Sequence, residues 1–162
     1  MTLLASAPAW LVACMLLLAF LAAIEDGLRL TIGNWQSAGI AIAAFVAVAI
    51  DGPATGLWQN ILLFVVMLAV GTFLFARGWM GGGDIKLLAA STLWFDLASG
   101  WKLLIAIALA GGLEALMLIG LRRIAWPDSV RRRVLLLRRG EGIPYGIAIA
   151  LGIALMASWL SR

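Results

Sequence analysis

Residues 7–24 read APAWLVACMLLLAFLAAI, and the next five residues read EDGLR. The first run contains no charged side chain, and it approaches the about 20 apolar residues that a helix needs to cross a membrane. Inside lipid an open chain must be helical, because unpaired backbone groups are too costly there. The stretch therefore predicts a membrane-spanning helix that ends beside two carboxylates, Glu25 and Asp26.

Five further apolar segments follow, so the sequence predicts an all-α integral membrane protein with a bundle of about six transmembrane helices. The six segments are Ala7–Ile24, Trp35–Ile50, Leu57–Phe75, Asp84–Leu97, Lys102–Leu121 and Pro144–Leu160. The fourth segment is short and carries two hydroxyl side chains, so it could be tilted or could stop short of spanning. Hydrophobic residues make up 64% of the chain and charged residues 12%, against about 25% charged in soluble domains. We interpret residues 1–162 as a single membrane domain.

The distribution of lysine and arginine predicts how this bundle is oriented. With the N-terminus outside, only Lys102 and Arg162 of the 12 basic residues lie outside, and the rest lie in or beside cytoplasmic loops. Most of them belong to one basic loop, residues 122–142. Both termini are then expected outside, and the basic loop is expected to contact anionic membrane lipid rather than nucleic acid.

The residue types that are missing restrict the possible chemistry. The chain has no histidine and one cysteine, Cys14, which excludes a zinc site of the cysteine and histidine type. Serine–histidine and cysteine–histidine catalysis are excluded as well, because the general base is missing. We therefore expect no metal and no other cofactor, and acid–base chemistry that depends mainly on carboxylates.

Two aspartates are placed to act together. Asp26 follows the first helix and Asp84 opens the fourth, so the predicted topology puts both at the cytoplasmic membrane face. Two carboxyl groups in close approach tend to share one proton, and the ionised member can then take a proton from water. This pair predicts an aspartyl peptidase. Neighbouring Glu25 points about 100° away from Asp26 on a helix, so only one of the two should face Asp84.

The glycines at residues 81–83 precede Asp84 directly. Glycine permits close approach of another backbone, which suits an extended peptide substrate in this loop. A flexible turn capped by Asp84 at the helix start explains the same residues equally well. The spacing alone leaves both interpretations open.

Four stretches together resemble the type IV prepilin peptidase family. Residues 81–86, GGGDIK, resemble its Gly-x-Gly-Asp signature, and Asp26 with Ile32 and Asn34 downstream is similar to its first motif. Residues 111–113 and 143–148 are similar to two of its later stretches. The family usually has proline where this chain has Gly33. The chain lacks the four-cysteine domain of the long members, so it resembles the short, peptidase-only form associated with tight-adherence (Flp-type) pili.

This resemblance implies an aspartyl endopeptidase of the bacterial inner membrane, with Asp26 and Asp84 as its catalytic pair. Its substrate would be a prepilin, a transmembrane helix with an N-terminal leader, cleaved after a glycine at the cytoplasmic face. The residues expected to support the loops or the substrate are Gly81, Gly83, Lys86 and Asn34.

Three further polar residues lie near this pair, and their roles are considered separately. Lys86 could stabilise the ionised pair or meet a substrate carboxylate, or it could be an ordinary interfacial lysine. Asn34 is expected to form a hydrogen bond within the first loop. Glu114 lies roughly 12 Å from the cytoplasmic end of the fifth helix, and we expect it to make a structural hydrogen bond rather than to act in catalysis.

Two other classes of protein remain open. One is a small proton- or cation-coupled transporter that uses Asp26, Asp84 and Glu114, and the other is a non-catalytic membrane protein of pilus assembly. A conduction path needs polar groups through the full depth of the membrane, whereas here they gather at one face. This distribution favours the peptidase.

Overall fold

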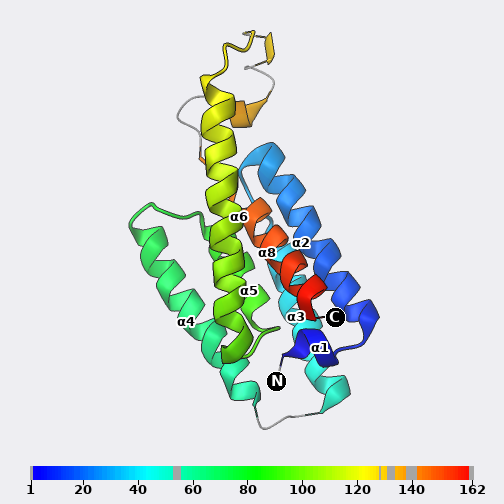
Figure 1. Ribbon diagram of the computed structural model, residues 1–162. Helices are drawn as coiled ribbons and strands as arrows, with labels where there is room; N and C mark the ends of the chain where they lie inside the picture. The colour runs from blue at the N-terminus through cyan, green and yellow to red at the C-terminus, as the bar shows by residue number, and fades with distance from the viewer. Residues whose placement is uncertain (1, 53–55, 128, 131–133, 138–141, 161–162) are drawn as a thin grey trace.

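The computed structural model shows a bundle of helices, and it describes residues 2–52, 56–127, 129–130, 134–137 and 142–160 (Figure 1). The α-helices are α1 (Leu3–Ser6), α2 (Ala9–Arg29), α3 (Asn34–Asp51), α4 (Leu57–Ala76), α5 (Gly82–Thr92), α6 (Leu97–Arg123) and α8 (Tyr145–Leu160). A 3-10 turn, η1 (Leu135–Leu137), lies between α6 and α8. The described residues include no strand.

The predicted all-α membrane bundle is confirmed, because each of the six predicted segments corresponds to one helix, α2 to α6 and α8. Four of them, α2, α3, α4 and α6, are long and apolar enough to cross a membrane. Helix α8 is apolar but shorter, with 16 residues.

Helix α5 is the segment that the sequence marks as the weakest. Its 11 residues extend over about 16 Å, which is too short to cross a bilayer alone. The backbone after it stays inside the protein, where Trp94 and Phe95 are completely buried. The Trp94 indole donates a hydrogen bond to the Ile40 carbonyl (3.1 Å), and the Asn60 amide donates one to the Leu93 carbonyl (2.9 Å). Non-helical backbone at membrane depth is tolerated when protein surrounds it in this way.

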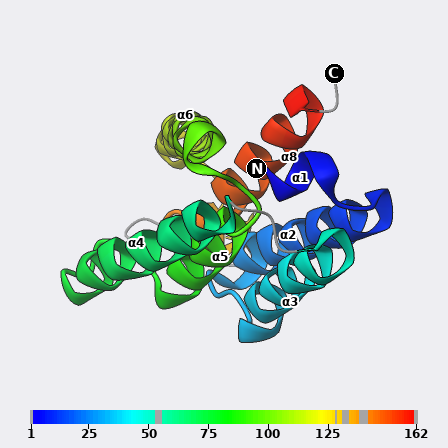
Figure 2. The same ribbon diagram turned by 90° about the horizontal axis from the view of Figure 1, so that it is seen from below.

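The centre of the bundle is formed by α2, α3, α5 and α8. Each contributes a completely buried apolar side chain: Met15, Ile40, Leu87 and Ile149, respectively. Helices α4 and α6 are peripheral and bury few residues. Figure 2 shows α6 nearly end-on, with α8 between it and α2. The exposed apolar side chains of the outer helices fit a surface covered by lipid.

Four helix ends meet at one end of the bundle, and we call this the carboxylate end. Helix α2 ends there and α3, α5 and α8 begin there. The chain reverses after α2 at Leu30, which has a left-handed backbone (φ 53°) and donates its N–H to the Asp26 carbonyl. A bulky residue in this conformation is strained, and such strain is concentrated at functional sites.

The predicted basic loop, residues 122–142, is only partly described, and residues 128, 131–133 and 138–141 lie outside the described part of the chain. Arg122, near the end of α6, donates hydrogen bonds to the carbonyls of Leu136 (2.8 Å) and Gly142 (2.9 Å). These bonds hold both described sides of the loop against α6.

Candidate active site

Asp26 and Asp84 line the same cavity, which has a volume of about 590 Å³ and lies at the carboxylate end. Both side chains are buried, with 4% of Asp26 and 9% of Asp84 exposed. The cavity is lined by α2, α5, the start of α8 and the loops beside them, through Asp26, Leu30, Gly78, Trp79, Met80, Gly81, Asp84, Gly142, Ile143 and Tyr145. The two aspartates that the sequence pairs are thus brought together.

Helix α8 holds Asp26 in place. The backbone N–H of Gly146 donates a hydrogen bond of 2.7 Å to Asp26 Oδ2. Gly146 is in the first turn of α8, where backbone N–H groups have no partner within the helix. A Cβ atom on this residue would lie 2.9 Å from Asp26 Oδ2 and 2.9 Å from Ile32 Cδ1. Only glycine therefore lets α8 approach Asp26 so closely.

Asp84 is held by the start of its own helix. It is the third residue of α5, and its carboxylate interacts with the backbone N–H of Gly81, the residue before the helix. This is the position from which the reciprocal half of a capping box can form. The N-cap residue of α5 is thus Gly81 and not Asp84, which lies in the first turn of the helix and also lines the cavity. The second oxygen, Oδ1, is buried and has no hydrogen-bond partner among the described residues.

The glycines before Asp84 differ in how much space surrounds them. A Cβ atom on Gly81 would lie 2.7 Å from Asp84 Oδ2, and one on Gly83 would lie 3.0 Å from Ile32 Cβ. A Cβ atom on Gly82 would instead make an ordinary contact of 3.5 Å with Phe75. The local packing therefore gives a steric reason for a Gly-x-Gly-Asp pattern.

We expect Gly82→Ala to retain the activity of this site within about twofold, and Gly81→Ala or Gly83→Ala to lose about tenfold or more. Displacing Asp84 by even part of an ångström moves a reacting group, and displacing Ile32 disturbs the side chain that packs beside Gly146; such misplacement is costly. Steady-state rates of the three purified variants test this. Equal loss in all three variants would contradict the steric explanation.

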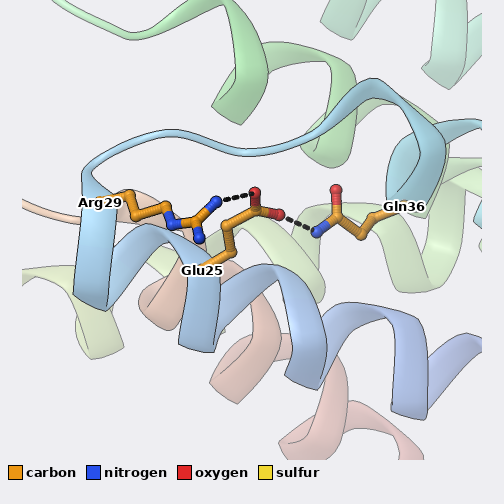
Figure 3. Close-up of polar contacts among 3 residues, drawn as sticks. All are labelled: Glu25, Arg29 and Gln36. Atoms are coloured by element: carbon orange, nitrogen blue, oxygen red, sulfur yellow. Dashed lines mark hydrogen bonds and ion pairs between the residues drawn. The ribbon is translucent and has the colours of Figure 1, made fainter.

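Glu25 faces a different helix from Asp26. It accepts a hydrogen bond from the Gln36 amide of α3, and it lies 3.9 Å from the Arg29 guanidinium (Figure 3). This network holds the end of α2 to the start of α3. Since Asp26 is bonded to α8, the two neighbouring carboxylates are separated by the helical rotation between them, as expected from the sequence.

Lys86 and Asn34 bond to each other. The Lys86 ammonium of α5 donates a hydrogen bond of 2.8 Å to Asn34 Oδ1 at the start of α3. The hydrogen bond expected for Asn34 within the first loop is thus made to another helix. The pair connects the two helices that flank the loop at residues 30–33, which supports that loop.

The hydrogen bonding of Glu114 differs from the expectation. Its carboxylate faces the backbone N–H of Ala148 in α8, yet among the described residues neither oxygen makes a hydrogen bond of normal geometry, although both are buried. Among the described residues, the predicted structural hydrogen bond is therefore not formed with normal geometry. Glu114 also interacts electrostatically with Asp26 and Asp84, which places it near the carboxylate end.

Gly146 and Ile32 are the site residues whose roles the sequence did not indicate. Both lie in the stretches that resemble the family, but nothing in their spacing shows that Gly146 contacts Asp26, 120 residues earlier. Ile32 packs where α5 and α8 meet, because Gly83 and Gly146 both approach its side chain. The only available signal was the resemblance.

A lipid-facing helical bundle with two buried aspartates in one cavity defines a polytopic membrane protein with a two-carboxylate site. The sequence model of the type IV leader peptidase family matches residues 10–122, which include both aspartates and more than half of the chain. The chain belongs to this family and is therefore a membrane peptidase. No curated protein and no solved structure matches it.

Proposed function

We propose that the protein is an aspartyl endopeptidase that removes the leader from Flp-like type IV prepilins. It cuts after a glycine, at the cytoplasmic face of the bacterial inner membrane, with Asp26 and Asp84 as its catalytic pair. The observation that carries the proposal is the presence of both carboxyl groups, buried, in one cavity at one end of the bundle. The family match supports the leader-bearing class of substrate.

The reaction needs one proton shared between the two aspartates, as close approach of like charges favours. The ionised carboxylate takes a proton from water, and the resulting hydroxide attacks the scissile carbonyl. The protonated carboxyl group donates a hydrogen bond to that carbonyl oxygen as negative charge develops on it. The intermediate then breaks its C–N bond, and the leaving amine takes a proton from the pair.

The surroundings of the pair suit this chemistry. The N–H of Gly146 orients Asp26, and the N–H of Gly81 orients Asp84, so neither carboxylate has to find its position during the reaction. Gly78 also lines the cavity and presents no side chain to an entering peptide. An extended substrate backbone can therefore lie close to both aspartates.

The test is to incubate the purified protein with a prepilin in detergent and to determine the new N-terminus by mass spectrometry. We expect a single cut after the glycine that precedes the hydrophobic helix. Addition of EDTA should leave the rate unchanged, because the chain has no histidine and one cysteine to hold a catalytic metal. Absence of cleavage, or cleavage that EDTA abolishes, would contradict the proposal.

A further inference from the structure

An apolar groove of about 700 Å³ lies between α6 and α8. The two helices cross closely at small residues, where a Cβ atom on Gly111 would lie 3.3 Å from Ala148 Cβ. Beside this crossing the groove is lined by leucine, isoleucine and alanine, and three of its leucines, Leu109, Leu113 and Leu155, are more than half exposed. Apolar side chains with this exposure can receive either lipid or a hydrophobic helix.

Glu114 is the feature that distinguishes this groove from an ordinary lipid-facing surface. It lines the groove, and both of its oxygens are buried beside the backbone N–H of Ala148, with no hydrogen bond of normal geometry among the described residues. An unpaired carboxyl group in apolar surroundings costs free energy. Acyl chains cannot offset this cost, because they have no hydrogen-bond donor. A ligand that brings backbone N–H groups can offset it.

The groove and the catalytic cavity lie on neighbouring residues of α8. Both are lined by the first turn of α8, where Tyr145 faces the cavity and Ile147 faces the groove. Gly146, between them, donates its N–H to Asp26. A chain that leaves the groove at this turn is therefore beside the catalytic pair.

We propose that the groove between α6 and α8 seats the hydrophobic helix of the substrate, with the first turn of that helix against Glu114. This inference rests on the proposed function and names the site that binds the substrate's helix. The first turn of a helix has N–H groups without partners and a positive dipole end, which a carboxylate complements. The 12-residue interval from Lys102 to Glu114 along α6 is about 18 Å long, enough for three helical turns. The extended segment before the helix then passes over α8 toward Asp26 and Asp84.

The first test fills the groove. Ala110 lines it, whereas Ala108 is exposed on α6 outside it, so Ala110→Trp and Ala108→Trp are matched variants. The rates are compared for a full prepilin and for a short peptide that ends soon after the cleavage site. The quantity compared is kcat/KM for the full prepilin divided by kcat/KM for the short peptide. We expect Ala110→Trp to lower this ratio about tenfold, and Ala108→Trp to leave it unchanged. An unchanged ratio in Ala110→Trp would overturn the inference.

The second test concerns Glu114. In Glu114→Leu we expect the same ratio to fall about tenfold while Tm rises by a few degrees, because a buried unpaired carboxyl group is removed. A carboxyl group with only a structural role would give the opposite, a lower Tm with an unchanged ratio. That result would overturn the role of Glu114.

A crosslinking test does not depend on cleavage. A benzophenone amino acid is placed at Leu113, in the groove, or at Leu116, which is exposed elsewhere on α6, in a protein that also carries Asp84→Asn. We expect crosslinks to the hydrophobic helix of the prepilin from position 113 and not from 116. Equal crosslinks from both positions, or none from position 113, would overturn the inference. Wild-type protein that cuts neither substrate would instead count against the proposed function.

Discussion

Asp26→Asn and Asp84→Asn are each expected to lower kcat for prepilin cleavage by about a thousandfold or more, while the protein still folds. An asparagine has the shape of an aspartate, and its carbonyl oxygen can still accept the N–H of Gly146 or of Gly81. It cannot take a proton from water or share one with its neighbour. Loss of a positioned acid or base costs about 10²–10⁴-fold, and loss of the developing charge stabilisation adds to this.

The measurement is a steady-state rate for each purified variant, with circular dichroism and thermal unfolding to show that the fold is kept. Glu25→Gln is the matched control, because Glu25 is the neighbouring carboxylate in the same helix and bonds to α3 instead of lining the cavity. We expect this control to stay within a few-fold of wild type. Full processing by either aspartate variant, or an equal loss in Glu25→Gln, would refute the assigned pair.

Most of the fold was predictable because lipid restricts the chain strongly. Each apolar run had to be a helix, and each of the six became one. The short fourth run was ambiguous because composition does not show where a helix ends inside a protein. The structure ends α5 at Thr92. Two hydrogen bonds then complete the buried connection, one from Asn60 of α4 to the Leu93 carbonyl and one from Trp94 to the Ile40 carbonyl of α3. Such contacts with other helices cannot be predicted from the residues of the segment itself.

The position of Glu114 relative to the other helices could not be obtained from the end of its own helix. Helix α6 continues to Arg123, and its last turns extend beyond the other helices in Figure 1. The end of α6 therefore does not mark the level at which α2 ends and α8 begins. Glu114 lies beside Ala148, near that level, although the sequence places it well inside the helix.

In the candidate site too, contacts between residues close in sequence could be predicted, whereas contacts between residues far apart in sequence could not. The two aspartates could be paired from the sequence because charge distribution and motif both place them at one membrane face. The groups that hold them could not all be found in this way. Gly81 lies three residues from Asp84, and its role follows from the geometry of a helix start. Gly146 lies 120 residues from Asp26, so only the packing of α8 against α2 reveals it.

Gly146→Ala is the second variant for which we expect a large effect, a loss of about a hundredfold in kcat for prepilin cleavage. The added Cβ atom would lie 3.0 Å from Asp26 Cβ and 2.9 Å from Asp26 Oδ2, and on its other side it would meet Ile32. Either α8 or Asp26 has to move, which weakens the Gly146 hydrogen bond. Misplacement of a reacting group by about 1 Å can cost 10²-fold.

Gly142→Ala is the matched control for this variant. Gly142 lines the same cavity, but a Cβ atom there would have nothing within 4 Å among the described residues, so we expect nearly wild-type cleavage. A double variant, Gly146→Ala with Ile32→Val, removes the Ile32 Cδ1 atom that faces the new methyl group, and it should recover part of the lost rate. The Asp26 contact remains in the double variant, so recovery should be incomplete. If Gly146→Ala instead cleaves as fast as Gly142→Ala, the close approach of α8 does not position Asp26, and the aspartate must be oriented by α2 alone.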